Sequence, residues 1–395
     1  MSKIDELVAN MCADGVPHIK LGDLEDQGIV KLGRGDVISK TDLRDTPGDY
    51  PVYSSSAASD GLFGRYGEFM FDDEKITWSI DGGGKFFYRE KHKFSVTNVC
   101  GWMKVLKSEC VSTRYLYYVL ISIWGGRTYN YTVKAHPSVI REDYFIPLPP
   151  LEIQKEIVAI LDKFLELEAE LEAELEARKK QYSFYRFKLV DNNKSKTVKL
   201  KDITEATFWI MPSTPAYDES EGIAYITSKN LSKGNIEYKG SKRISQKSYD
   251  DITKNRPIKE NDLLIGMIGT IGEIARVKKS DLPFYGQNMY LVRFDQNQID
   301  TNYFLHYFDS ELMKDYFNSV KNNSAQGYLK AEHIDEIQIP LPTLIKQKEI
   351  AGILDTYSAL IHDIAIGLPA ELIARRQQYE YYRNKLLTFK ELDVA

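Results

Sequence analysis

Apolar residues recur at alternating steps of three and four along two long stretches of the chain. The first seam begins after Leu151 and consists of Ile153, Ile157, Ile160, Phe164, Leu167, Leu171, Leu175, Arg178, Tyr182, Tyr185 and Leu189. The second consists of Ile350, Ile353, Tyr357, Leu360, Ile364, Leu368, Leu372, Arg375, Tyr379, Tyr382 and Leu386. This spacing is a heptad pattern interrupted by stutters, and the first seam predicts a helix of about 39 residues, roughly 58 Å long. Because neither narrow stripe can be buried alone, we expect the two helices to pack together, antiparallel.

The two helices begin with the same sequence. IPLPPLEIQKEIVAILD (146–162) and IPLPTLIKQKEIAGILD (339–355) are identical at 12 of 17 positions and lie 193 residues apart. The helix ends also match, ARKKQYSFYRFKL (177–189) against ARRQQYEYYRNKL (374–386), but at an offset of 197. Such a repeat indicates an internal duplication. The second helix carries four extra residues, and Gly367 and Pro369 predict a kink or short break there.

Short strand-like runs separated by turn residues precede each helix, for example KITWSI and FSVTNVCGWMKVL in the first half and IAYITS and FYGQNMYLVRF in the second. VKLKDI (198–203) also echoes IKLGDL (19–24). We therefore predict an α+β fold of two mixed α/β domains joined by two long antiparallel coiled-coil helices, with a pseudo-twofold internal repeat. The predicted segments are an N-terminal amphipathic segment (1–16), a first domain (17–145), a first helix (146–192), a second domain (197–338) and a second helix (339–391).

Composition and charge limit the possible functions. No run of apolar residues is long enough to span a bilayer, and the N-terminus lacks the pattern of a signal peptide, so we expect a cytoplasmic protein. Cys12, Cys100 and Cys110 fit no disulfide framework or zinc pattern. The net charge is −5, and residues 1–145 and 199–338 each have 18 basic and 20 acidic residues. If the chain binds DNA, another protein is expected to supply much of the phosphate contact.

Enzyme motifs are missing from the sequence. There is no GxxxxGK[ST] phosphate loop, no sequence that would hold S-adenosylmethionine and no convincing nuclease motif. GGGK (82–85) is interpreted as a tight turn between strands. GMIGTIGE (266–273) is interpreted as a strand pair or bulge, with a close backbone approach to a ligand left open. We expect no catalytic residues, no metal and no cofactor bound by this chain.

Polar loops and basic patches of the two domains are candidates for DNA contact, because Asn, Gln, Arg, Lys and Ser read base edges and cations hold phosphates. The candidates are Ser54, Ser55, Ser56, Lys85, Arg89, Lys91, Lys93, Arg127, Ser228, Lys229, Asn230, Lys242, Arg243, Gln287, Asn288, Asn322, Asn323 and Gln326. Each loop alone could equally be a solvated surface loop. Alanine at Lys229 and Asn230 is expected to weaken recognition of one part of a DNA target.

The whole layout resembles the specificity (S) subunit of Type I restriction-modification systems. The resemblance rests on the repeated IPLP…QKEI…ILD sequence, the two helix ends, the N-terminal ELVANMCADGVPHIKLGDL and GLPAE (367–371). It implies that the mixed domains are target recognition domains, each reading one half of a bipartite double-stranded DNA site. It also implies two docked methyltransferase (M) subunits that bind S-adenosylmethionine, restriction/motor (R) subunits that join to cut, and no catalysis by this chain.

The helices are then spacers that carry subunit-docking residues, for which the candidates are Gln154, Lys155, Glu156, Tyr182, Tyr185, Gln347, Lys348, Glu349, Tyr379 and Tyr382. The ELEA sequence, present three times over residues 166–177, resembles the short repeats that set half-site spacing in this family. A different class also stays open: a non-catalytic coiled-coil tether or decoy that does not read DNA sequence. Co-purification with methyltransferase subunits and sequence-specific DNA retention would separate the two.

Overall fold

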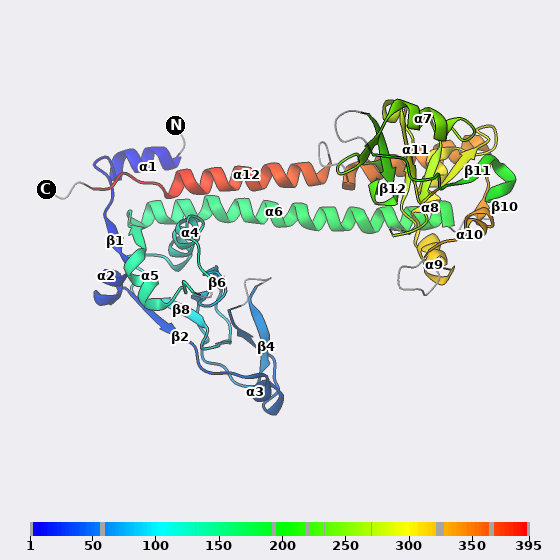
Figure 1. Ribbon diagram of the computed structural model, residues 1–395. Helices are drawn as coiled ribbons and strands as arrows, with labels where there is room; N and C mark the ends of the chain where they lie inside the picture. Colours follow the sequence, from blue (N-terminus) through cyan, green and yellow to red (C-terminus); the bar gives the residue numbers. More distant parts are fainter. Residues whose placement is uncertain are drawn as a thin grey trace. The chain divides into compact units, whose positions relative to one another are not determined.

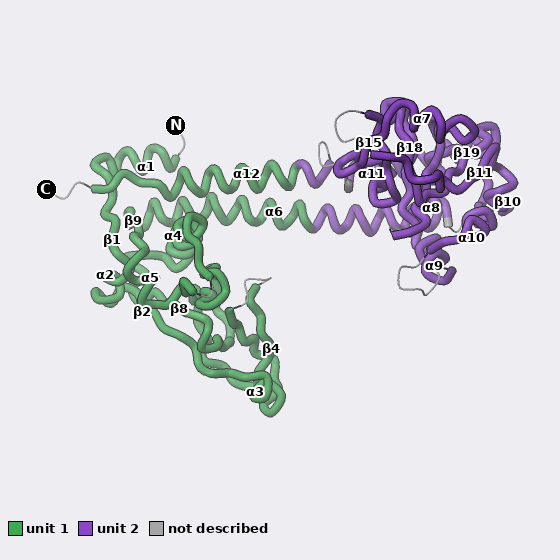
Figure 2. Tube along the Cα trace, viewed as in Figure 1, with its two compact units in different colours: residues 1–172, 371–395 green, residues 173–370 purple. Residues whose placement is uncertain are grey.

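The chain forms two compact units in a computed structural model (Figures 1 and 2). One unit contains Met1–Glu172 and Glu371–Ala395, and the other contains Ala173–Ala370. The structure describes residues 3–55, 60–130, 132–191, 195–217, 222–232, 234–269, 271–320, 328–362 and 367–392. The division between the units falls inside the long helix α6 (Leu151–Arg186), so each unit holds one domain and part of this helix.

The first domain is built on two sheets. The four-stranded sheet is antiparallel, in the order β2 (Val30–Arg34), β8 (Cys100–Val105), β5 (Lys75–Ser79), β6 (Phe86–Arg89). The three-stranded sheet has the order β4 (Leu62–Tyr66), β3 (Tyr50–Tyr53), β7 (Ser95–Val96), and β3 and β7 are parallel. The helices of this domain are α2 (Leu21–Asp26), α3 (Lys40–Asp45), α4 (Thr113–Trp124) and α5 (Pro137–Asp143).

The second domain repeats this plan. Its four-stranded antiparallel sheet has the order β11 (Thr204–Ile210), β19 (Met289–Phe294), β16 (Leu263–Gly266), β17 (Ile274–Arg276). Its three-stranded sheet has the order β15 (Lys242–Ile244), β12 (Ile223–Thr227), β18 (Phe284–Gln287), again with one parallel pair, β12 and β18. Since both sheets keep their strand order and direction, the duplication covers the domains as well as the helices.

Smaller elements complete the second domain. A hairpin joins β13 (Leu231–Ser232) and β14 (Asn235–Ile236). The helices are α7 (Gln246–Thr253), α8 (Thr301–Phe308), α9 (Glu311–Val320) and α10 (Ala331–Asp335), and short 3-10 turns are η2 (Leu200–Ile203), η3 (Ser228–Asn230) and η4 (Lys279–Asp281). α8 takes the place in this domain that α4 takes in the first, directly after the last strand of the larger sheet.

In each half, a two-stranded ribbon links the beginning of the domain to the IPLP segment. β1 (His18–Lys20) pairs antiparallel with β9 (Phe145–Pro147), and β10 (Thr197–Lys199) pairs with β20 (Gln338–Pro340). Ile19 lies opposite Ile146, and Val198 lies opposite Ile339. The ribbon ends at the IPLP prolines because proline cannot donate to a further ladder bond, and a helix begins just after them.

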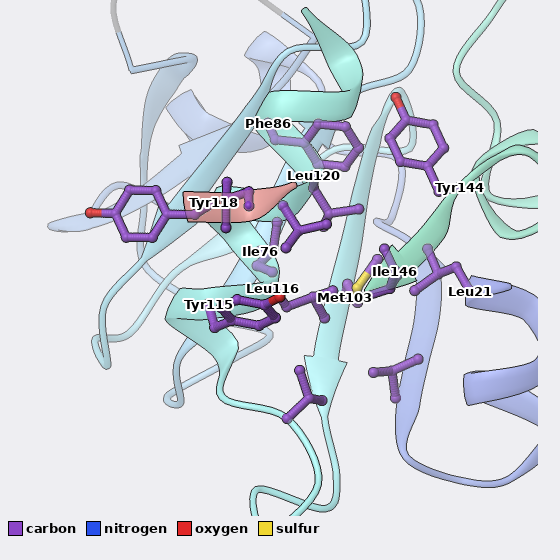
Figure 3. Close-up of a cluster of buried hydrophobic side chains, with 14 of the residues drawn as sticks. Leu21, Ile76, Phe86, Met103, Tyr115, Leu116, Tyr118, Leu120, Tyr144 and Ile146 are labelled. Atoms are coloured by element: carbon purple, nitrogen blue, oxygen red, sulfur yellow. The ribbon is translucent and has the colours of Figure 1, made fainter. Parts of the chain in front are cut away.

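The core of the first domain lies between the four-stranded sheet and α4 (Figure 3). α4 is helical from Thr113 because Ser112 caps it, its hydroxyl accepting a hydrogen bond from the N–H of Tyr115. The helix packs Tyr115, Leu116 and Leu120 toward the sheet, where they meet Ile76, Phe86 and Met103 of β5, β6 and β8. This core includes residues of α6 and also Tyr379 and Leu387, so the chain's C-terminal helix completes the first domain.

The predicted first helix is α6, and it is followed by a π-helical turn (Phe187–Asp191). Every predicted seam position from Ile153 to Leu189 is buried or half-buried, which confirms the seam. Within the first unit α6 lies against α12 (Leu368–Leu387): the Phe164 and Tyr382 rings stack at 5.3 Å, and Arg376 reaches Glu168 and Glu172. The partner positions rise along one helix while they fall along the other, so this pair is antiparallel.

The predicted second helix is described as two helices, α11 (Leu344–His362) and α12, and Pro369 lies in the first turn of α12. The seam prediction is wrong at Ile353 and Leu360, which are 45% and 37% exposed. α11 instead buries Leu354 and Ile361, one position further along. α11 packs against α8 of its own domain, and Leu354 and Ile361 join the core of that domain together with the seam residue Ile350. Ile364 lies outside the described residues.

The predicted N-terminal amphipathic segment is the helix α1 (Lys3–Met11), with Ile4 buried and Met11 45% exposed. The segment that follows α1 pairs with the segment that follows α12. The N–H of Val16 donates to the carbonyl of Lys390 (2.9 Å), and the N–H of Leu392 donates to the carbonyl of Val16 (2.9 Å). Gly15 makes this approach possible: its φ is +111°, and a Cβ there would lie 2.8 Å from the Lys390 carbonyl oxygen.

Candidate nucleic-acid interface

A buried glutamine joins the first domain to the helix that follows it. Gln154, the glutamine of the first QKEI, is 0% exposed. Its Nε2 donates to the carbonyls of Cys110 (3.0 Å) and Pro149 (2.8 Å), and its Oε1 accepts from the N–H of Ser112 (3.0 Å). Because Ser112 caps α4, this one side chain fixes α4, α6 and the IPLP segment to each other.

The second half repeats this arrangement atom for atom. Gln347 is also 0% exposed, and its Nε2 donates to the carbonyls of Gln298 (3.1 Å) and Pro342 (2.8 Å). Its Oε1 accepts from the N–H of Asp300 (2.7 Å), the residue that caps α8. The two domains therefore leave their ribbons and meet their helices in the same local geometry.

Further along each helix, a carboxylate contacts the same domain helix again. Asp162 accepts hydrogen bonds from the Nε of Arg114 (2.8 Å) and from the hydroxyl of Tyr118. In the second half Asp355 lies 2.7 Å from Nε2 of His306 and accepts from Asn302. The contact is preserved although its chemistry differs, since a cation and a phenol are replaced by an imidazole and an amide.

Each domain also holds the end of the other helix. Tyr182, near the end of α6, is 6% exposed in the second unit, and its hydroxyl lies 3.1 Å from Nδ1 of His306. Tyr379, near the end of α12, is 8% exposed in the first unit, where burial raises its pKa to about 12. Arg186 and Arg383 cover these two rings. A domain is thus fixed to the start of one helix and the end of the other.

Three loops of the first domain meet where the parallel strands β3 and β7 end; we call them the first loop cluster (residues 54–55, 81–85 and 97–99). The hydroxyl of Thr97 donates to that of Ser54 (2.8 Å), and the hydroxyl of Ser79 donates to the carbonyl of Ser55 (2.7 Å). A Cβ on Gly82 would lie 2.0 Å from that carbonyl oxygen, so glycine permits the close approach of two loops.

The second loop cluster (residues 228–230, 267–269, 271–272 and 287–288) occupies the same place in the second domain, where β12 and β18 end. The hydroxyl of Ser228 donates to the carbonyl of Ile268 (2.5 Å), and the N–H of Met267 donates to the carbonyl of Asn288 (3.2 Å). The β16–β17 turn carries Gly269 and Gly272 at positive φ, as the β5–β6 turn carries Gly83 and Gly84.

Eight of the predicted DNA-contact residues gather in these clusters: Ser54, Ser55, Lys85, Ser228, Lys229, Asn230, Gln287 and Asn288. They do not all present their side chains outward. Ser228 and Asn230 are buried, and the amide of Asn230 holds its own turn, donating to the carbonyl of Glu237 (2.8 Å) and accepting from the N–H of Thr227 (3.0 Å). Lys229 between them is exposed. Of the predicted pair in this loop, only Lys229 has an exposed side chain, while Asn230 is buried and stabilises the turn.

The remaining candidates lie elsewhere in their domains. Lys91, Lys93, Arg127, Lys242 and Arg243 are exposed, and four of these side chains lie over or beside protein groups: Lys93 over Phe69, Arg127 beside Asp143, Lys242 over Tyr217 and Arg243 on the Gly222 carbonyl. Arg89 is 6% exposed and lies over the ring of Tyr53, where burial lowers its pKa. It is a core residue of β6. Ser56, Asn322, Asn323 and Gln326 lie outside the described residues.

The predicted docking residues of the helices divide in a similar way. Lys155, Lys348 and Glu349 are exposed, and half-buried Glu156 pairs with Lys3 at 2.5 Å. The other six candidates make contacts within the chain. The two glutamines, Gln154 and Gln347, bond to backbone groups, and Tyr182 and Tyr379 are buried. Tyr185 stacks on Tyr357, and Tyr382 stacks on Phe164. The docking prediction is wrong for the buried glutamines, whose hydrogen-bonding groups all face the interior.

One residue of the first loop cluster was not among the residues predicted from the sequence. Asn98 lies in the first cluster, half-buried, one residue before Val99. The sequence predicts a strand there, because FSVTNVCGWMKVL is rich in residues that favour strands.

Within the described ranges, no helix is both long and apolar enough to cross a membrane. The same residues contain no group of three or more His, Cys, Asp or Glu side chains arranged to hold a metal ion.

Comparison with known proteins gives a consistent result. The family described as the Type I restriction modification DNA specificity domain matches residues 20–177 and again residues 192–373. A putative type I specificity subunit of Mycoplasma pneumoniae is 29% identical over 387 residues, covering 95% of this chain and 99% of the relative. The specificity subunit of a type I restriction enzyme of Escherichia coli is 30% identical over 281 residues, covering 67% of this chain and 66% of the relative.

Solved structures show the same fold. The S subunit of a type I restriction-modification system from M. genitalium superposes with a TM-score of 0.54 at 16% identity, over 91% of this chain and 94% of that one. A chain from a structure of type I R-M complex assembly gives a TM-score of 0.57 at 13% identity, over 91% and 97%. Each of the two matched segments contains one loop cluster. Since the family model matches most of the sequence, the chain belongs to the type I restriction-modification DNA specificity family and is a specificity (S) subunit with two specificity domains.

Proposed function

We propose that this S subunit reads a bipartite double-stranded DNA target, with residues 17–145 and 197–338 acting as two target recognition domains, one for each half-site. The observation that carries the proposal is the repeat of the loop cluster at the same strand ends in both domains. Both domains are also fixed to their helices by the same glutamine bonds. A protein built this way offers two similar but chemically different reading surfaces.

The proposal includes partner subunits. Residues 1–145 and residues 199–338 each carry 18 basic and 20 acidic residues, so neither half is charged to hold phosphates strongly by itself. Two methyltransferase subunits docked on the S subunit would supply that contact, and restriction/motor subunits would join to cut. We assign the docking to Lys155, Lys348 and Glu349, which are exposed at the beginnings of the helices.

The chemistry is proposed to reside in the partners. The sequence has no motif for S-adenosylmethionine or for nucleotide phosphates, and we assign the binding of S-adenosylmethionine to the methyltransferase subunits. The S subunit then contributes sequence recognition, with no catalysis of its own. Because its target is cellular DNA, on which the partner subunits act, we propose that the chain is cytoplasmic.

The test is co-expression of the chain with the type I methyltransferase subunit of its source organism, in cells whose methylated adenines are then mapped by single-molecule sequencing. The proposal expects a stable complex and methylation at one motif composed of two specified parts and an unspecified spacer. Cells that express the methyltransferase subunit alone serve as the control and should lack the motif. A chain that purifies alone and retains DNA without regard to sequence would instead be a tether, and would overturn the proposal.

A further inference from the structure

We propose that two equivalent carboxamides, Asn98 of the first loop cluster and Gln287 of the second, read bases, one in each half-site. The inference deepens the proposed function and rests on it. Gln287 lies among the predicted candidates, whereas Asn98 does not. What joins them is their position in the repeated fold.

The backbone bonds of the two clusters establish the equivalence. Ser79 pairs with Cys100 at the start of β8, and Gly266 pairs with Met289 at the start of β19. The next bond is also the same: the N–H of Ile80 donates to the carbonyl of Val99 (3.0 Å), as the N–H of Met267 donates to that of Asn288 (3.2 Å). Asn98 and Gln287 each precede that carbonyl by one residue, so the fold presents a carboxamide at the same place twice.

The backbone at Asn98 is held while its side chain is available. Its carbonyl accepts two hydrogen bonds from the guanidinium of Arg34, at 3.0 and 2.7 Å. The side chain is half-buried, and its amide makes no hydrogen bond with any other described residue. The backbone at Asn98 is therefore fixed, and its carboxamide, which has no hydrogen-bond partner among the described residues, is available to an external one.

Gln287 is in a comparable state. It is half-buried at the end of β18, and its Oε1 accepts a hydrogen bond from the hydroxyl of Tyr225 (3.3 Å). That bond orients the amide, and Nε2 is left without a hydrogen bond inside the described chain. One lone pair of Oε1 is still available, so both a donor and an acceptor can face a ligand.

The surroundings fit DNA. A carboxamide that offers one donor and one acceptor side by side matches N7 and N6 of adenine in the major groove. Exposed Lys229 lies in the second cluster, and half-buried Lys85 lies in the first, so that each cluster has a cation for a phosphate. Gly83 and Gly269 keep the adjoining turns free of side chains, which lets the backbone come close to a ligand. We therefore expect an adenine to be specified by each carboxamide.

The test uses the full chain with its methyltransferase partner and compares the methylation motifs of Asn98→Ala and Gln287→Ala. Each variant should lose discrimination at one adenine of one half-site, by on the order of 10- to 100-fold, and leave the other half-site unchanged. Gln27→Ala and Asn297→Ala are the matched controls. Both amides are exposed and lie beyond the opposite ends of the strands: the Gln27 carbonyl accepts from Lys107, two residues after β8, and Asn297 follows β19 by three residues. Their removal should leave the motif as it is.

A second pair of variants covers the possibility that alanine disturbs the loops. Asn98→Asp and Gln287→Glu keep the shape of the side chain and remove the donor, which favours cytosine over adenine at the position read. Their thermal unfolding should match that of the parent chain. An unchanged motif in both acidic variants would overturn the inference, even where the alanine variants fail to fold. A parent chain that directs no bipartite methylation would instead reject the proposed function.

Discussion

At the scale of single residues, the two buried glutamines are predicted to stabilise the chain strongly. Gln154→Ala leaves one N–H and two carbonyls of the junction without their partner and opens a small cavity. We expect it to lower the free energy of unfolding by about 2–4 kcal/mol, measured by urea unfolding. Lys155→Ala, at the exposed neighbouring position, should change it by less than about 0.5 kcal/mol. Equal effects of the two substitutions would contradict this account of the junction.

The second residue-scale prediction concerns acid. Asp73 lies 2.6 Å from the ammonium groups of both Lys75 and Lys104. Burial acts to raise the pKa of Asp73, but the two ammonium groups outweigh it and hold the pKa below its usual range. A carboxyl with a lowered folded-state pKa stabilises the fold above its unfolded pKa of about 3.9, and this contribution is lost as pH falls through the folded-state value.

Asp73→Asn should therefore reduce stability at neutral pH by about 1–3 kcal/mol, since Lys75 is nearly buried and loses its counter-charge. The difference from the parent chain should shrink steadily below about pH 4. Thermal unfolding between neutral and acid pH measures it. Asp72→Asn changes an exposed carboxylate next in sequence and supplies the control. A difference that persists unchanged in acid would show that the ion pair does not stabilise the domain.

Residue roles were the least predictable from the sequence. The QKEI repeat was correctly singled out, yet its glutamines were assigned to docking, because a polar residue on a helix is normally exposed. Only the structure shows that each glutamine amide forms hydrogen bonds with three backbone groups. Asn98 was missed for the opposite reason. It lies in an apolar run, and its equivalence to Gln287 comes from a backbone bond pattern shared with a loop that has a different sequence.

At the scale of elements, periodicity predicted α6 well and α11 less well. Each seam position of α6 is at least half-buried, although the start of this helix also packs on the first domain and buries Leu161 beside the seam. α11 packs on α8, so the residues that it buries depend on its own domain as well as on a partner helix. A heptad pattern cannot separate these two demands. The exposed Ile353 and Leu360 are the result.

An interhelical ion pair gives a prediction at this scale. Arg376 of α12 lies 2.6 Å from Glu168 and 2.5 Å from Glu172, which hold the same place in two successive ELEA units. A double-mutant cycle with Arg376→Ala and Glu168→Ala should give a coupling free energy of about 0.5–1 kcal/mol that decreases in high salt. The cycle for Arg375 and Glu371, a looser pair at 3.4 Å within α12, should give less. A coupling that is absent at low salt would mean that Arg376 does not fix the register.

At the scale of the whole molecule, duplication was visible in the helices and hidden in the domains. IPLP and QKEI persist because both junctions need the same glutamine geometry. The domains keep their strand order while their sequences differ, since a sheet accepts many sequences with the same alternation. The sequence therefore predicted two mixed domains and a repeat. It did not predict that seven strands of one domain correspond in order to seven strands of the other.

The spacing of the target is the whole-molecule prediction. Each ELEA unit adds about 6 Å to a helix, against about 3.4 Å per base pair of DNA. Deleting residues 170–173 should shorten the unspecified spacer of the methylation motif by one or two base pairs and leave both half-sites unchanged. Glu170→Gln, which keeps the helix length, should leave the spacer as it is. A deletion variant that methylates with the original spacer would reject the role of the helix in setting distance.

The pairing of Val16 with the segment after α12 has a consequence for how the protein is made. The core of the first domain needs Tyr379 and Leu387, whereas the second unit is a single continuous stretch, Ala173–Ala370. During synthesis the second unit can close as soon as its own residues have emerged, but the first must wait for residues made about 200 positions later. The domain that the ribosome makes first is therefore completed last, and a chain cut short within α12 would carry one complete domain and one with an incomplete core.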